Sequence, residues 1–328
     1  MDAWERPPST VAVLHLNQVG DLVFGLPALA ALRAGFPEAR ILSVVRQNLA
    51  PLLSATSVSG TGLVDELIEH RGVRDFFRTA EALRAREIDL AVCLSESPRS
   101  RLLAYLSRAP RRVGLDDGPL ASLLTERVEK RGLPSTSNDI RLVRGLGCPL
   151  PYDSYVGLIE VAPRDRQRAI DLLREQGLPA EQRLVVLAPG ASQGRGLKEW
   201  PLERFVEVAR HVGAKQGVVA VFVGTGLPDG SERDLPNGCL DLSGRTSLRE
   251  LAGLLSLTDL FIGNDSGALH LAACLAVPCV ALFGPTDPDE TGPQGEGHVV
   301  LRADASGSME SIPVVAVIEA VERQLPGV

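Results

Sequence analysis

Short apolar runs of strand length recur along the chain and alternate with longer segments of helical periodicity. The runs occupy residues 11–16, 41–45, 63–68 and 90–94, and then residues 184–188, 218–223, 260–262 and 279–283. Most of these runs are apolar throughout rather than at every second position, so we expect strands that are buried on both faces of a parallel sheet. Strands that alternate with helices predict an α/β protein.

The runs fall into two groups, and the stretch between them, residues 134–163, is rich in Pro, Gly, Ser and Tyr. This composition is typical of a hinge, and 328 residues exceed the usual size of one hydrophobic core. We predict two doubly wound, Rossmann-like domains, residues 1–158 and 159–328, facing each other across a ligand cleft at the carboxyl ends of the strands. The last helix, near residues 312–325, is expected to pack back on the first domain.

Composition and charge narrow the class of protein. Hydrophobic residues make up 45% of the chain and charged residues 23%, the balance of a soluble globular protein. A formal net charge of −7 disfavours a nucleic-acid partner. The five cysteines lack Cys-x-x-Cys spacing, so neither a disulfide framework nor a zinc site is indicated.

The start of the chain lacks the apolar core of a secretory signal, and we expect a cytoplasmic protein with at most peripheral contact with the inner membrane surface. Residues 266–286 carry no charge and approach the length of a membrane span. Pro278 interrupts this stretch, and its pattern changes from helical to strand-like. A buried helix followed by a buried strand explains it better.

The loop after the first predicted strand contains Gly20 and Asp21 and leads into a helix. Asp21 would lie near the cleft as an ionised carboxylate. A helix-capping role is the alternative, and the spacing alone favours it, because Asp stabilises the start of a helix.

Two loops of the second half are glycine-rich. Residues 188–201 combine three glycines with Ser192 and Lys198, which suit a phosphate, although a flexible surface turn is equally compatible with this composition. Residues 222–230 imitate a dinucleotide-binding fingerprint, but the third glycine is misplaced, and we expect a turn or an edge of the nucleotide pocket.

A fourth loop joins a predicted strand to a helix through Asn264, Asp265, Ser266 and Gly267. Free N–H groups and the positive end of a helix meet there and suit a diphosphate. We expect Asp265 to accept hydrogen bonds from sugar hydroxyls. His270 lies one turn further on the face of Ser266, where a ligand-binding role and a structural role are equally open.

The paired Asp287 and Asp289 resemble the aspartates that hold a metal ion in other sugar transferases. The neighbouring Gly284, Pro285 and Pro288 favour a turn, so we assign no metal.

At these loops the sequence resembles the ADP-heptose:lipopolysaccharide heptosyltransferase family, glycosyltransferase family 9, which has the GT-B architecture. The similarity rests on five groups of motifs. They are residues 20–21 with 26–29, 189–192 with 198–201, 241–248, 263–267 with 270–273, and 283–288.

The resemblance implies roles for individual residues. Asp21 matches the catalytic base, which reverses the preference for a cap alone. The lysine that contacts the donor phosphate matches Lys198, and the donor sugar and diphosphate would be bound by Ser192, Asp265, Ser266, Gly267 and His270. Arg99 matches a basic residue on the acceptor side.

The implied activity is an inverting, metal-independent transfer of a heptose-type sugar from a nucleotide diphosphate donor, ADP-heptose, to a hydroxyl of a glycan acceptor such as the lipopolysaccharide inner core. The only small molecule expected is this donor, with no separate cofactor. Asn17 and Gln18, residues 137–139 and the region near residue 303 depart from the family pattern. These departures keep a small secondary metabolite or a protein as acceptor, or a non-catalytic nucleotide-sugar binding protein, as alternatives.

Overall fold

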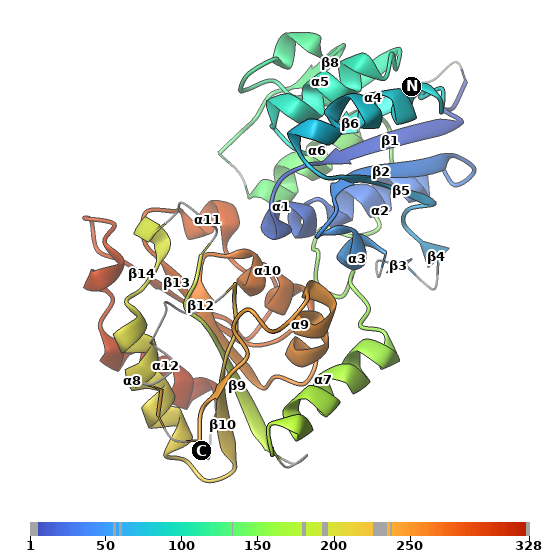
Figure 1. Ribbon diagram of the computed structural model, residues 1–328. Helices are drawn as coiled ribbons and strands as arrows, with labels where there is room; N and C mark the ends of the chain where they lie inside the picture. The colour runs from blue at the N-terminus through green and yellow to red at the C-terminus, as the bar shows by residue number, and fades with distance from the viewer. Residues whose placement is uncertain are drawn as a thin grey trace. The chain divides into compact units, whose positions relative to one another are not determined.

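The computed structural model describes residues 6–54, 57–58, 61–132, 134–178, 182–191, 196–225, 235–236 and 238–325. The chain divides into two compact units, Met1–Glu160 and Val161–Val328. Each unit has its own parallel sheet of six strands with helices on both faces (Figure 1). The predicted α/β class with two doubly wound sheets is confirmed.

In the first unit the strand order is β5-β2-β1-β6-β7-β8. The strands are β1 Thr10–His15, β2 Arg40–Arg46, β5 Glu66–His70, β6 Leu90–Cys93, β7 Arg111–Leu115 and β8 Glu126–Val128, and β3 Ser57–Val58 pairs with β4 Thr61–Gly62. The helices are α1 Val19–Phe24, α2 Leu26–Gly35, α3 Ala50–Leu53, α4 Phe76–Arg84, α5 Pro98–Leu106 and α6 Ser135–Gly145, with the 3-10 turns η1 Val73–Asp75 and η2 Ala121–Leu123.

Both faces of this sheet are covered because its central strands are apolar on both sides. Ala12 and Leu14 of β1 face a core that includes residues of α4 and α5. Val11 and Val13 point to the opposite face and are fully buried as well. On that side α6 packs against α1 and α2.

In the second unit the strand order is β11-β10-β9-β12-β13-β14. The strands are β9 Arg183–Ala188, β10 Val218–Phe222, β11 Leu240–Asp241, β12 Leu260–Asn264, β13 Cys279–Phe283 and β14 Val299–Arg302. The helices are α7 Pro163–Glu175, α8 Leu202–Gly213, α9 Leu248–Leu255, α10 Gly267–Cys274, α11 Pro288–Thr291 and α12 Val314–Gln324, with the 3-10 turns η3 Gly196–Lys198 and η5 Met309–Ser311.

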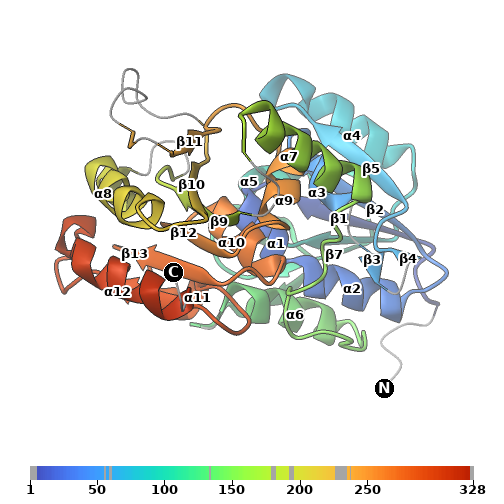
Figure 2. The ribbon, with the colours of Figure 1, turned by 90° about the horizontal axis from the view of Figure 1, so that it is seen from below.

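The last helix, α12, belongs to the core of the second unit. Val317 and Val321 are buried in the same cluster as Phe205 and Val208 of α8, and Figure 2 shows the two helices side by side. Its expected return to the first unit stays a prediction.

Two expectations about local structure need correction. The predicted hinge contains a full helix, α6, because Ile140, Leu142 and Val143 are buried against the sheet and neighbouring helices. The strand predicted at residues 63–68 lies further along the chain, because β5 covers Glu66–His70.

Among the described residues, no helix is long and apolar enough to cross a membrane.

Candidate active site

In the second unit, polar side chains meet where β12 leads into α10. Asp265 follows the last residue of β12, and Ser266 is the extended N-cap of α10. The first N–H groups of a helix have no intrahelical partner, and their positive end attracts anions. Ser266 Oγ is buried and has no hydrogen-bond partner within the described part of the chain. The turn therefore offers donors to an anion, as predicted for Ser266 and Gly267.

Gly263 in this motif has a packing role. A Cβ atom there would lie 2.8 Å from the Phe261 ring and 3.2 Å from Ala188 Cβ of β9. Real Cβ atoms essentially never approach another atom as closely as 2.8 Å, so glycine at this position leaves room for the ring of Phe261, two residues earlier in β12.

The carboxylate of Asp265 joins Lys198 to His270. Lys198 Nζ lies 2.5 Å from Asp265 Oδ2, and His270 Nε2 lies 3.2 Å from Asp265 Oδ1. Burial opposes ionisation of Asp265, but the hydrogen bonds and charges of His270 and Lys198 outweigh it and hold the pKa of that carboxyl well below its usual range. The structure thus brings together three residues that sequence analysis assigned to the donor.

These contacts modify the expectation for Asp265. Sequence analysis predicted that it accepts hydrogen bonds from sugar hydroxyls, yet each of its oxygens here already has a protein partner. A carboxylate oxygen has a second acceptor position, so a hydroxyl can still bind beside Lys198 or His270. Ser192 and residues 226–230 of the third loop lie outside the described residues.

Asn264 and Glu199 bind backbone groups of the loop that carries Lys198, a role that sequence analysis did not predict. Asn264, the last residue of β12, is fully buried and bonds to both ends of the loop that carries Lys198. Glu199 Oε1 accepts the N–H of Ala191 at 2.9 Å across the same loop. A buried amide at the end of an apolar strand was the available signal, because such a group needs partners.

In the first unit, Asp21 lies in the first turn of α1, half-buried. Its Oδ2 accepts the N–H of Gln18 at 3.0 Å as part of a capping box. The capping interpretation is therefore confirmed, and it leaves the other carboxylate oxygen available to a ligand. Capping and catalysis are compatible uses of one carboxylate.

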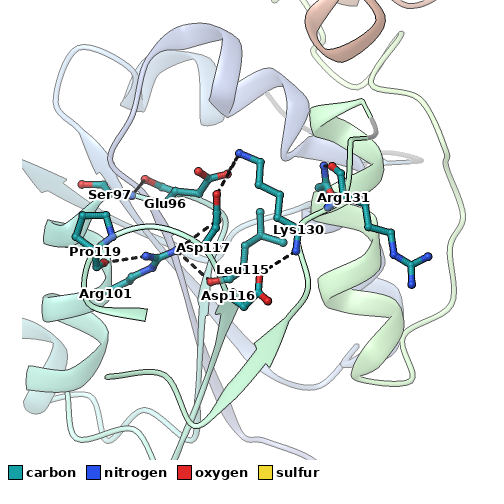
Figure 3. A network of polar contacts seen from close by, with 11 residues as sticks. Glu96, Ser97, Arg101, Leu115, Asp116, Asp117, Pro119, Lys130 and Arg131 are labelled. Carbon is teal, nitrogen blue, oxygen red and sulfur yellow. Dashed lines mark hydrogen bonds and ion pairs between the residues drawn. The ribbon is translucent and has the colours of Figure 1, made fainter. Parts of the chain in front are cut away.

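More charged residues lie at the carboxyl ends of β6, β7 and β8. Figure 3 shows Lys130 between two carboxylates, 2.7 Å from Glu96 and 3.4 Å from Asp117. The buried Arg101 donates to the carbonyl oxygens of Pro119 and Leu115 at 2.8 and 3.0 Å, which fixes the loop after β7 (Figure 3).

Asp139 of α6 is buried near this group. Burial first, and then the charges of Asp21 and Glu96, raise its pKa well above the usual value, although Lys130 opposes the shift. The folded protein therefore favours the protonated form of the Asp139 carboxyl group.

Arg99, the predicted acceptor-side residue, lines a basic cavity of about 390 Å³. The cavity lies at the carboxyl ends of β1, β2 and β5 and is also lined by Leu16, Arg46, His70 and Arg71. Arg46 Nε donates to Leu16 O at 2.9 Å, and burial, together with the charges of Arg99 and Arg46, lowers the pKa of His70 although Asp75 opposes this. The cavity suits an anionic group.

The aspartates at residues 287 and 289 lie at the start of a helix, as the predicted turn suggested. Asp287 caps α11 by accepting the N–H of Asp289 at 3.1 Å, and it pairs with Arg302 at 3.4 Å. Within the described ranges no group of three or more His, Cys, Asp or Glu side chains could hold a metal ion.

Two Rossmann-like units, one with a lysine–carboxylate pair beside a helix start, define a glycosyltransferase of the GT-B fold. The crystal structure of the glycosyltransferase family 9 protein from Veillonella parvula DSM 2008 is similar, with a TM-score of 0.82, 25% identity, and coverage of 99% of this chain and 98% of that one. The structure of E. coli ADP-heptose lps heptosyltransferase II shares the fold, with a TM-score of 0.78, 24% identity and coverage of 96% and 98%.

In sequence, lipopolysaccharide heptosyltransferase 2 of Salmonella typhimurium is 26% identical over 89% of this chain and 87% of its own length. The profile of glycosyltransferase family 9 (heptosyltransferase) matches residues 76–312. The chain belongs to this family, as the sequence resemblance indicated.

Proposed function

We propose that the protein transfers a heptose-type sugar from ADP-heptose to a hydroxyl of a glycan acceptor of the lipopolysaccharide-core type, with inversion at the anomeric carbon and without a metal ion. The main support for this proposal is the contact of Lys198 with Asp265. This contact places the lysine cation beside the start of α10, whose N–H groups suit a diphosphate. The names of two similar proteins, an ADP-heptose lps heptosyltransferase and a lipopolysaccharide heptosyltransferase, support the donor and acceptor classes.

In this mechanism the carboxylate of Asp21 takes the proton of an acceptor hydroxyl while that oxygen attacks the anomeric carbon. The bond from this carbon to the diphosphate breaks, and the electron pair leaves with the nucleoside diphosphate. One displacement inverts the configuration. General-base assistance contributes about 10²–10⁴-fold, so charge stabilisation must supply much of the remaining rate.

The charge that develops on the leaving diphosphate would be stabilised by Lys198 and by the first-turn N–H groups of α10. The arginines of the basic cavity, Arg46, Arg71 and Arg99, would bind an anionic group of the acceptor. A core glycan with carboxylate or phosphate groups fits this cavity better than a neutral acceptor does.

The test incubates ADP-heptose with the protein and three acceptor classes: a core glycan, a small hydroxylated metabolite and a protein. Mass spectrometry should detect a gain of one heptose on the core glycan, and NMR should show the inverted anomeric configuration. Transfer only to another class would change the acceptor, retained configuration would refute the single displacement, and nucleotide-sugar binding without any transfer would indicate a binding protein.

The matched variant is Asp21→Asn, whose side-chain oxygen can still accept the N–H of Gln18 but cannot take a proton. We expect turnover to fall by roughly 10²–10⁴-fold, with unchanged ADP binding. Turnover near that of the unchanged protein would remove Asp21 as the base.

A further inference from the structure

Asn264 connects the two ends of the loop that carries Lys198. Its Nδ2 donates to the carbonyl oxygen of Pro189 at 2.6 Å, and its Oδ1 accepts the N–H of Trp200 at 3.1 Å. The side chain is fully buried. Because the two contacts use the opposite ends of one planar amide, they fix its orientation as well as the separation of the loop ends.

Each loop end is anchored in turn. Pro189 follows β9, which pairs with β12 in the centre of the sheet. The indole Nε1 of Trp200 donates to Ile312 O at 3.0 Å, and its ring packs edge-on against Phe205 with 5.0 Å between centroids. The loop therefore starts and ends at rigid points, and Asn264 holds those points together.

Lys198 lies two residues before Trp200, and its ammonium group meets Asp265, the neighbour of Asn264. Two adjacent residues thus act on one loop: the side-chain amide of Asn264 binds backbone groups at the loop ends, and the carboxylate of Asp265 binds the Lys198 ammonium group. Asparagine carries its donor and its acceptor on two separate atoms, whereas the hydroxyl of Ser or Thr offers both from a single oxygen. Aspartate would face the Pro189 carbonyl with a second acceptor, and leucine would leave two buried backbone groups unpaired.

We propose that Asn264 is a positioning residue that holds residues 196–200 against the end of β9, so that Lys198 is placed against the donor site before the donor arrives. That Asn264 positions Lys198 is argued from the structure. That this positioning aids turnover rests on the proposed function. Placement before binding lowers the ordering cost at the moment of reaction.

The lysine content of the chain permits a direct test. The sequence has only three lysines, Lys130, Lys198 and Lys215, and the Lys198 side chain is 14% exposed. An amine-specific acylating reagent, followed by peptide mass spectrometry, measures the reactivity of each lysine in the same sample. In Asn264→Ala the two buried hydrogen bonds to Pro189 and Trp200 are lost and no longer hold residues 196–200 in place. We therefore expect Lys198 to react about tenfold faster or more. Lys130 and Lys215 should keep their rates.

Asp259→Ala is the matched control. Asp259 precedes β12 at its other end, where Oδ2 accepts the N–H of Leu184 at 2.8 Å and also ties β12 to β9. This variant should lower the melting temperature and leave the Lys198 rate unchanged. Asn264→Ser, a milder change, covers the case in which Asn264→Ala fails to fold.

The outcomes separate the two proposals. Unchanged Lys198 reactivity in a folded Asn264 variant, or an equal rise at all three lysines in both variants, would overturn the positioning role. Selective exposure of Lys198 together with no sugar transfer by the unchanged protein would retain that role and refute the proposed function. If both hold, Asn264→Ser should raise the donor KM more than it lowers kcat, and saturating ADP should restore protection of Lys198.

Discussion

At the scale of residues, the pKa values of two buried carboxyl groups shift in opposite directions. Lys198 and His270 stabilise Asp265 as a carboxylate, whereas burial and the nearby acidic groups favour the protonated form of Asp139. The environment rather than the residue type decides which carboxyl carries charge.

Asp139 makes stability depend on pH. In the unfolded chain the pKa of this carboxyl is near its ordinary value of 3.8, while burial in the folded protein raises the pKa well above that value. The folded state binds more protons above that pH, so this residue lowers stability as pH rises, by about 1.4 kcal/mol for each pH unit until the folded group ionises.

We therefore expect Asp139→Asn, which is neutral at every pH, to melt at a higher temperature than the unchanged protein at pH 7. The advantage should shrink as the pH falls toward 4. Thermal unfolding measured across this range would show it, and a difference that is independent of pH would contradict the proton assignment.

Lys198→Ala should weaken the donor site in two ways, because the lysine is proposed to interact with the diphosphate both before and during bond cleavage. Hydrogen bonds to charged groups contribute about 1.5–3 kcal/mol, so kcat/KM for the donor should fall by roughly 10–100-fold. Steady-state kinetics and ADP titration calorimetry measure the two effects. Lys215→Ala, on the surface beside Glu322, is the control and should change neither.

Sequence analysis named Asp21, Lys198 and Asp265 because they lie in loops after predicted strands, and the family resemblance gave them their roles. It could not find the partner of each. Lys198 and Asp265 are 67 positions apart, and the two contacts of Asn264 span 64 and 75 positions. Only the register of β9 against β12 brings them together.

At the scale of elements, α7 and α9 approach each other closely at Gly253. A Cβ atom on Gly253 would lie 2.3 Å from the carbonyl oxygen of Asp165 in α7. Arg249 of α9 reaches the Asp165 carboxylate at 2.9 Å near the same contact. The two helices can only occupy these positions if residue 253 has no side chain.

Gly253→Ala should consequently destabilise the second unit by about 1–3 kcal/mol, the usual cost of overpacking. Urea unfolding followed by circular dichroism measures the change. Gly213→Ala, at the end of α8, is the control, since its Cβ would meet only Cys239 Sγ at 3.9 Å. An equal effect of both substitutions would mean that helix propensity rather than the close contact decides.

Central strands were predicted well, and strands at or next to the sheet edges poorly. The run at residues 279–283 coincides with β13, where every residue is buried. The strands β7, β8, β11 and β14 were missed, because partly exposed or charged residues such as Arg111, Glu126 and Arg302 interrupt the apolar pattern. The helix α6 was missed because the prolines and serines around it suggested a hinge.

At the scale of the whole molecule, each unit has its own sheet and core, and the candidate residues divide between them. Asp21, Arg99 and Asp139 belong to the first unit, and Lys198 and Asp265 to the second. The acceptor and donor roles proposed here thus fall on separately folded parts of the chain.

Because Lys198 and the start of α10 are proposed to stabilise the leaving diphosphate, transfer should be insensitive to chelation. We expect the same initial rate with excess EDTA and with added Mg²⁺. A rate that collapses with EDTA and returns with Mg²⁺ would refute the metal-independent mechanism while leaving the sugar-transfer activity in place.

Trp200 has a further practical consequence. The chain has two tryptophans, Trp4 and Trp200, and the indole of Trp200 is buried two residues beyond Lys198. Indole emission responds to nearby charge and to water. In a chain with Trp4→Phe, Trp200 would be the only tryptophan that fluoresces. Its emission would then report whether residues 196–200, which include Lys198, are in place.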